Sequence, residues 1–313
     1  MEGLVLQTTG NDYVVKSGES FFRCHLKGSF KQDGIRTTNP IAVGDVVLFE
    51  KEEDGEEWCW ITGIRPRKNY IIRRSINLSK KGQILGANID LALLVVTINY
   101  PVTSTTFIDR FLATCEAYNV PVSIVFNKID RYSDDEFREL TSLIALYEKI
   151  GYRCFTVSAL TMEGMDKVIE TITGKISLFS GHSGVGKSSL INSLVPGAER
   201  KTQSISEANN SGVHTTTYSE MIPVDGKADT FIIDTPGIRG FGTLDFEKSE
   251  VGHYFPDIFK LSAECRFHNC THTHEPGCAV IEALGSSILA HSRYKSYLSI
   301  LNEDEEEKYR APY

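Results

Sequence analysis

One stretch of the chain combines glycines, a lysine and serines at a spacing that suits phosphate binding. Residues 181–188 fit the pattern G-x-x-x-x-G-K-S without a mismatch, after an apolar run and before a helical pattern. The glycines let backbone N–H groups turn toward phosphate oxygens, and the positive end of the following helix adds to the attraction. The Lys187 ammonium can reach the outer phosphates, and the Ser188 hydroxyl can bind Mg²⁺. The predicted triphosphate-binding residues are Gly181, His182, Ser183, Gly184, Val185, Gly186, Lys187, Ser188 and Ser189.

A second motif indicates which base is bound. Asn127-Lys128-Ile129-Asp130 follows an apolar strand pattern. A carboxylate can accept hydrogen bonds from both the ring N1–H and the exocyclic amine of guanine, whereas adenine presents an acceptor at that ring position. Asp130 is therefore expected to select guanine, and a short loop after the next strand is expected to support the guanine carbonyl through a main-chain N–H. The predicted base-binding residues are Asn127, Lys128, Ile129, Asp130, Ser158 and Ala159.

The remaining parts of a nucleotide switch come after the phosphate loop. Asp234 ends an apolar run, where an aspartate can hold Mg²⁺ through water, and Gly237 can offer its N–H to the γ-phosphate. Upstream, residues 215–217 supply three consecutive threonine hydroxyls, one of which is expected to close on Mg²⁺. The sequence leaves open which hydroxyl does so. Thr217 is taken as the candidate magnesium ligand beside Ser188 and Asp234.

The water-activating group is not evident from the motifs. Ras-like enzymes carry a glutamine just after the switch glycine, whereas this chain has Ile238 there and no glutamine nearby. Intrinsic hydrolysis is therefore expected to be slow. His214 is the nearest candidate for polarising the attacking water, and the alternative is that it binds a partner or has no such role.

The order of the motifs is rotated relative to the usual one. The base-reading segments precede the phosphate loop, whereas they ordinarily come last. Because domain termini often lie close together, joining them and opening the chain elsewhere leaves the same parallel sheet intact. Apolar runs alternate with helical patterns between residues 89 and 235, which is typical of a doubly wound fold. We predict a circularly permuted P-loop α/β domain over residues 74–242.

The first 73 residues show a different sequence pattern, one that is typical of a small β domain. Apolar and aromatic residues gather in short runs separated by turn-forming segments. The predicted strands are residues 4–9, 12–17, 21–26, 45–50 and 58–64. Five short strands in this length favour a closed barrel of the OB type. An SH3-like barrel and a fragment of a β-sandwich are the alternatives.

Basic residues cluster just after the predicted barrel. The stretch between residues 65 and 81 holds Arg65, Arg67, Lys68, Arg73, Arg74, Lys80 and Lys81 and no acidic residue. A looser group is formed by Arg23, Lys27, Lys31 and Arg36. The whole chain carries a formal charge of −8, so binding to a polyanion requires such local patches. The stretch suits contact with a nucleic-acid backbone, and a solvated surface or linker is the alternative.

Three of the seven cysteines crowd into residues 265–278. Cys265, Cys270 and Cys278, together with one histidine, suit tetrahedral Zn²⁺ in a closed structural site. His272 is the expected fourth ligand, while His268 and His274 remain rival ligands and buried free thiols the alternative. A helical zinc-binding domain is predicted over residues 243–313.

Nothing in the sequence indicates a membrane segment. No run of eighteen apolar residues occurs, and the N-terminal residues lack a basic region followed by an apolar stretch. A cytoplasmic location and a monomer are therefore the default expectations.

Together these segments resemble the circularly permuted GTPases that depend on the small ribosomal subunit, the RsgA, YjeQ or EngC family. The segments that carry the resemblance are "VGDVV", "PRKNYIIRRS", "NKID", "GHSGVGKSSLIN", "GVHTTT", "DTPGIRGFG" and "CRFHNCTHTHEPGCAV". The resemblance implies an OB fold, binding to the 30S subunit and its 16S ribosomal RNA late in maturation, and GTP hydrolysis stimulated by the subunit. It also implies Cys265, Cys270, His272 and Cys278 as the zinc ligands. Val213 departs from the arginine that family members often have.

Two other functions compete with this interpretation. One is a GTPase switch that serves a non-ribosomal client, and the other is a binding module whose GTPase activity is lost. The complete set of Lys187, Ser188, Asp234 and Asp130 argues against the second alternative. GTP turnover with and without 30S subunits would separate all three functions.

Overall fold

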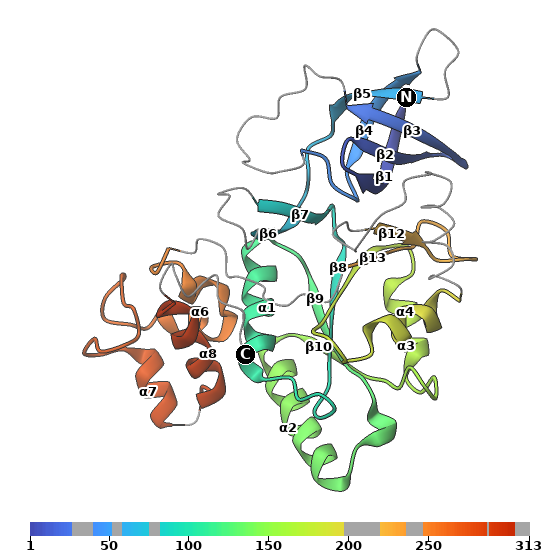
Figure 1. Ribbon diagram of the computed structural model, residues 1–313. Helices are drawn as coiled ribbons and strands as arrows, with labels where there is room; N and C mark the ends of the chain where they lie inside the picture. Colours follow the sequence, from blue (N-terminus) through green and yellow to red (C-terminus); the bar gives the residue numbers. More distant parts are fainter. Residues whose placement is uncertain are drawn as a thin grey trace.

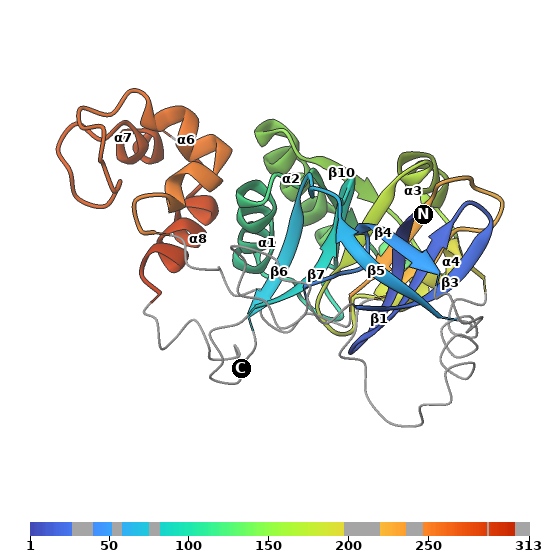
Figure 2. The same ribbon diagram turned by 90° about the horizontal axis from the view of Figure 1, so that it is seen from above.

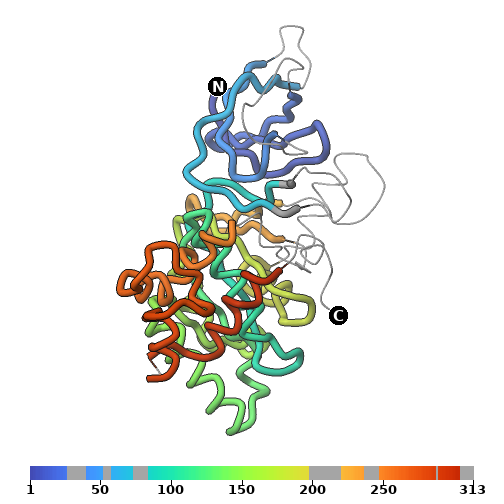
Figure 3. The backbone as a smooth tube through the Cα atoms, turned by 90° about the vertical axis from the view of Figure 1, so that its left-hand side faces the viewer, coloured from blue at the N-terminus to red at the C-terminus, as the bar shows by residue number. Residues whose placement is uncertain are grey.

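The computed structural model describes residues 1–26, 40–51, 58–74, 82–196, 220–235, 247–286 and 288–303. A small β-barrel lies at one end of the molecule, an α/β domain follows it, and a helical segment lies beside helix α1 (Thr105–Ala117; Figure 1). The tube view, turned by 90°, shows the same arrangement, with the barrel again at the top (Figure 3). The described residues contain no helix with the length and apolar character needed to cross a bilayer.

The barrel is closed by the return of its last strand in the sheet to its first. Its strands run in the order β1-β2-β3-β5-β4, and β4 pairs back with β1. Only the β3–β5 pair is parallel, and the inward residues, among them Val15, Phe49 and Ile61, are fully buried. The strand bounds are β1 (Glu2–Thr9), β2 (Asp12–Ser17), β3 (Ser20–Leu26), β4 (Val46–Lys51) and β5 (Trp58–Ile64). The predicted OB-type barrel is confirmed, and the sandwich alternative is wrong because the sheet closes.

The α/β domain is built on parallel strands and one antiparallel strand, which also pairs with the barrel. The strand order is β10-β9-β8-β11-β13-β12, and only β12 runs antiparallel to its neighbour. Strands that come last in the chain therefore lie on the far side of β11 from those that come first, as the predicted permutation requires. The bounds are β8 (Leu91–Val96), β9 (Val122–Phe126), β10 (Arg153–Thr156), β11 (Ile176–Ser180), β12 (Glu220–Pro223) and β13 (Phe231–Asp234).

Helices cover both faces of this sheet, each through an apolar stripe. Helices α1 (Thr105–Ala117) and α2 (Asp134–Ile150) pack into one core. Helices α3 (Met165–Ile172) and α4 (Lys187–Leu194) pack into the core on the other face. Helix α2 begins at a capping box, in which Ser133 and Glu136 satisfy each other's backbone N–H groups. The predicted doubly wound fold is confirmed.

Two parts of the fold remain. Strands β6 (Tyr70–Arg74) and β7 (Gly82–Ala87) form a hairpin that the sequence analysis did not predict, because the apolar run in β6 is only three residues long. The C-terminal helices have their own core, and their bounds are η2 (Val251–Tyr254), α6 (Pro256–Ser262), α7 (Ala279–Gly285) and α8 (His291–Leu301). The division at residues 73 and 242 stays a prediction, with the first boundary falling within β6.

Candidate nucleotide site and metal centre

The nucleotide motifs meet at one edge of the sheet. Residues 127–130 follow β9, residues 158–159 follow β10, and the phosphate loop follows β11. Asp234 is the last residue of β13. Because these four strands are parallel, their carboxyl ends lie on the same edge, where doubly wound domains bind their ligands.

Asn127 ties the base-reading segment to the phosphate loop. Its side chain is buried, its Nδ2 donates to the Val185 carbonyl at 2.9 Å, and its Oδ1 accepts from the Ala159 N–H at 3.1 Å. A Cβ at Gly186 would lie 2.5 Å from this Nδ2, and the Gly186 φ of +88° also favours glycine. One amide therefore holds three motifs that are far apart in the sequence in a fixed relation.

Lys128 and Asp130 belong to the same segment and have contacts of their own. The Lys128 ammonium donates to the Tyr100 carbonyl at 2.6 Å and also to the Gly184 carbonyl. The Asp130 Oδ1 accepts from the Ser158 hydroxyl at 2.6 Å, while Asp130 itself is exposed. Burial lowers the pKa of Lys128. The exposed carboxylate is open to a base whose edge carries two donors.

The phosphate loop has exposed serine side chains and a buried lysine side chain. Ser183, Ser188 and Ser189 are exposed, whereas Lys187 is buried and forms an ion pair with Asp234. Serine hydroxyl and carboxylate oxygens are donors that a hard cation such as Mg²⁺ prefers. This edge thus carries two such oxygen donors, the exposed Ser188 hydroxyl and the Asp234 carboxylate.

Two contacts of the loop were not predicted from the sequence. The Thr103 hydroxyl lies 2.7 Å from His182 Nε2, and Phe107 contacts the same imidazole edge-on. With Tyr100, these residues belong to the segment that follows β8 at the same sheet edge. Their position after a buried parallel strand could have predicted that they belong to the site, because the loops at the carboxyl edge of a parallel sheet contribute to one site.

Three predicted residues cannot be placed. His214, Thr217 and Gly237 lie outside the described residues. Their roles in water activation, magnesium binding and γ-phosphate contact stay predictions.

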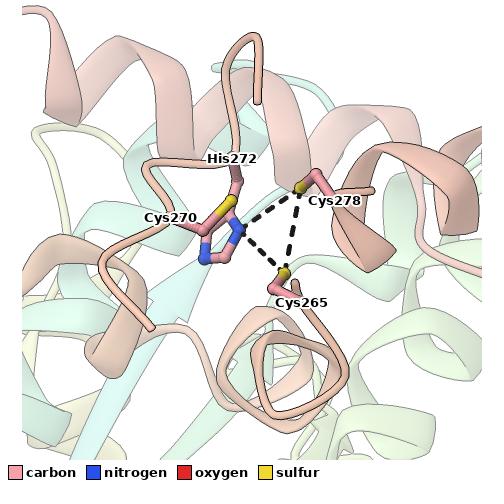
Figure 4. Close-up of side chains that lie close together, drawn as sticks. All are labelled: Cys265, Cys270, His272 and Cys278. Atoms are coloured by element: carbon pink, nitrogen blue, oxygen red, sulfur yellow. Dashed lines mark hydrogen bonds between the residues drawn. The ribbon is translucent and has the colours of Figure 1, made fainter. Parts of the chain in front are cut away.

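The cysteine cluster has the geometry of a metal centre. The side chains of Cys265, Cys270, His272 and Cys278 point toward one another (Figure 4), and their ligand atoms all lie within 4.8 Å of one another. The His272 Nδ1 lies 3.6 Å from the Cys265 sulfur and 3.5 Å from the Cys278 sulfur, and these two sulfurs are 4.0 Å apart. Tetrahedral Zn²⁺ would place sulfur pairs about 3.8 Å apart and sulfur–nitrogen pairs about 3.6 Å apart. The cluster could hold Zn²⁺, and the rival histidines His268 and His274 are not part of it.

Neighbouring side chains hold the loop that carries these ligands. The Tyr294 hydroxyl donates to the His272 carbonyl at 2.7 Å, and the Tyr297 hydroxyl donates to the Thr271 carbonyl at 2.7 Å. The Glu275 carboxylate accepts from the N–H groups of Thr271 and Thr273. Burial would raise the pKa of Glu275, but the hydrogen bonds from the Thr271 hydroxyl and from these N–H groups lower it well below the usual range. The loop is therefore held by its own contacts, as a structural site requires.

The basic stretch after the barrel is largely ion-paired where its side chains are described. Arg65 pairs with Glu2 at the surface, and Lys68 pairs with Asp90. Arg67 is buried and binds both oxygens of the fully buried Asp45. Arg67 is thus a structural residue of the barrel junction. The side chains of Arg73, Arg74, Lys80 and Lys81 lie outside the described residues.

Comparisons with known proteins place the chain in a family. The family model for the RsgA GTPase matches residues 64–244, and the model for the RsgA N-terminal domain matches residues 2–59. The chain belongs to the RsgA GTPase family. It is 59% identical to the small ribosomal subunit biogenesis GTPase RsgA of Bacteroides fragilis and 56% identical to that of Phocaeicola vulgatus, in each case over the full length of both chains.

Solved structures agree with this assignment. YjeQ from Thermotoga maritima is 31% identical, with a TM-score of 0.76 over 97% of this chain and 99% of that one. YloQ, described as a circularly permuted GTPase, is 26% identical, with a TM-score of 0.74 over 100% of this chain and 96% of that one. As a member of this family the chain is a GTP hydrolase, and its permuted motif order is a property that YloQ shares.

Proposed function

We propose that the chain hydrolyses GTP while bound to the small ribosomal subunit, late in the maturation of that subunit. The single observation that carries the GTP site is the meeting of Asn127, Asp130 and the phosphate loop at one sheet edge. The ribosomal role is supported by the names of full-length relatives, which are small ribosomal subunit biogenesis GTPases. Direct contact with 16S ribosomal RNA, a monomeric state and a cytoplasmic location complete the proposal.

Each group has a distinct task in this mechanism. The Asp130 carboxylate selects guanine, and the N–H groups of residues 181–188 orient the phosphates in a fixed polar environment. Lys187, released from Asp234, neutralises charge on the outer phosphates. Mg²⁺, held by Ser188, Asp234 and Thr217, would supply further positive charge beside the phosphates. His214 orients the attacking water, and Gly237 donates its N–H to the γ-phosphate.

The decisive experiment measures GTP turnover with and without purified 30S subunits over a range of salt concentrations. The proposal predicts slow turnover by the free protein and strong stimulation by subunits that fades as salt rises, because contacts to RNA phosphates release counterions. A Lys187→Ala variant is the control for contaminating GTPases and should show neither activity. Turnover that subunits leave unchanged would favour a non-ribosomal client, and the absence of turnover would favour a binding module.

The cysteine cluster has a separate role in the proposal, that of a structural zinc site. Four protein ligands leave tetrahedral Zn²⁺ without an open coordination position. The metal would therefore contribute to folding rather than to catalysis. Cys278→Ser should reduce the metal content measured by mass spectrometry and raise hydrogen exchange in residues 251–286. Cys154→Ser, a thiol outside the cluster, should leave both unchanged. Full metal content in the Cys278→Ser variant would refute the assignment.

A further inference from the structure

A row of polar side chains crosses the junction between the barrel and the α/β domain. In the sheet, Gln7 of β1 lies directly opposite Glu220 of β12, and Glu220 lies directly opposite Asp234 of β13. Residues that are directly opposite in antiparallel strands project to the same face, with Cβ atoms about 5 Å apart. Asp234 in turn forms an ion pair with Lys187 of the phosphate loop. The row therefore leads from the barrel to the phosphate loop through two adjacent carboxylates.

Glu220 is the member of this row whose charge is least compensated. Among the described residues, its half-buried carboxylate has no hydrogen bond and no ion pair. On its other side, the side-chain oxygen of Gln7 is buried and also without a partner. Glu220 is thus partly buried and lies directly opposite the negative charge of Asp234. An acidic group in such surroundings costs stability unless a cation near it offsets the cost.

We propose that Glu220 is a positioning residue of the magnesium site, whose carboxylate holds a water ligand of the Mg²⁺ bound through Ser188 and Asp234. This inference rests on the proposed function, since it takes the magnesium site from it. Mg²⁺ keeps several of its waters when proteins bind it, so a carboxylate one strand away from a ligand can act through water. Lys187 carries one positive charge and is paired with Asp234, while Glu220 opposite Asp234 adds a second carboxylate. A divalent ion would supply the further positive charge that two neighbouring carboxylates require, and this attraction favours binding of the ion.

The assignment also gives β12 a function. This strand follows the predicted magnesium-binding segment of residues 215–217 in the sequence and pairs with barrel strand β1. The strand register thus links the barrel to the ion site through Gln7, Glu220 and Asp234, one residue on each of three strands.

The test measures how fast a fluorescent GDP analogue leaves the full-length protein as free Mg²⁺ is varied with a chelator. Glu220→Gln keeps the shape of the side chain and removes its charge, and it should raise the Mg²⁺ concentration for half-maximal retention by about tenfold. Asp229→Asn is the matched control. It removes one negative charge from the exposed turn of the same hairpin and should shift the midpoint by less than about twofold.

Two further variants keep the outcomes distinct. Asp234→Asn removes a predicted magnesium ligand and should shift the midpoint more than Glu220→Gln does. Glu220→Asp keeps the charge on a shorter stem and should recover part of the lost Mg²⁺ affinity. A normal midpoint for Glu220→Gln beside a shifted one for Asp234→Asn overturns the role of Glu220 alone. If Asp234→Asn is also normal, the magnesium site of the proposed function is wrong as well.

Discussion

The barrel and the C-terminal zinc-cluster segment, residues 247–303 as described, are attached to the α/β domain in different ways. The barrel shares the sheet of the α/β domain through the β1–β12 pair, and its Leu6 and Val43 belong to the same hydrophobic core as β8. Backbone contacts support this joint, since the Ala87 N–H donates to the Val43 carbonyl at 2.9 Å. The barrel therefore continues the central domain in both sheet and core.

The zinc-cluster segment instead rests on the outer side of α1, away from the barrel (Figure 2). Its core takes only Ala113 from the α/β domain, among the described residues. Among the described residues, this joint is crossed by the ion pairs of Arg110 with Glu303 and of Arg293 with Asp109, and Arg293 of α8 is 1% exposed. Its guanidinium binds Asp109 of α1 at 2.6 Å and both oxygens of Asp257 at 2.8 and 3.0 Å.

This difference determines how each joint should respond to mutation. Apolar contacts and strand pairing are spread over many atoms, so the loss of one group removes little. A buried ion cluster fails when one member is lost, because the remaining charges are left without a partner. Burial already raises the pKa of Asp109 despite the nearby Arg293 and the hydrogen bond that the Tyr147 hydroxyl donates to it, so the charge of Arg293 is needed there.

The largest expected effect comes from breaking the ion cluster. Arg293→Met should lower the free energy of unfolding by about 4 kcal/mol, because Asp109 would stay buried, and Asp257 partly buried, without their cation. Urea denaturation followed by fluorescence measures this change. Lys295→Met, an exposed lysine on the same helix, is the control and should change stability by less than about 0.5 kcal/mol. Similar values for the two variants would show that the cluster does not hold the joint.

The barrel joint has one position where the backbone itself is sensitive. Gly44 has a φ of +88°, and a Cβ there would lie 2.1 Å from the Ala87 carbonyl oxygen. Gly44→Ala should therefore cost about 3 kcal/mol, from both the left-handed conformation and the clash. Gly10 has a φ of +66° with open space around it, so Gly10→Ala should cost only about 1 kcal/mol. Equal losses in thermal denaturation would mean that the approach to Ala87 contributes nothing.

The smallest expected effect is at the surface of the barrel itself. Arg65 and Glu2 pair at 2.7 Å, but both side chains are about half exposed. Arg65→Ala should change the free energy of unfolding by less than about 0.5 kcal/mol, since solvent and salt screen such pairs. Urea denaturation at two salt concentrations checks this. A loss of 2 kcal/mol or more would show that the surface pair stabilises the barrel.

Many elements of the fold could be predicted because their signals are local. The Ser133–Glu136 capping box marks the start of α2, and the buried strand β8 appears as an unbroken apolar run. The phosphate loop could be recognised because its glycines and lysine lie within eight residues. Alternation of strand and helix patterns then gave the class of fold.

Other features were missed because they depend on partners that are distant in the sequence. Arg67 looks like one cation in a basic run, yet its partner Asp45 is buried with it. The hairpin of β6 and β7 has too short an apolar run to stand out. Tyr100 receives Lys128 through its backbone carbonyl, a contact that the type of side chain does not indicate.

The sequence by itself determined the parts of this protein: a closed small barrel, a permuted GTP-binding domain and a Cys/His cluster. It did so because strand periodicity, glycine-rich loops and closely spaced ligands are encoded within a few residues of one another. Only the tertiary structure decided how the parts are joined and which charges meet. Arg293 binds Asp109 although the two residues are 184 positions apart in the sequence. Glu220 lies opposite Asp234 only because two strands pair in one register. Such pairings follow from the packing of the whole chain, which no single segment specifies.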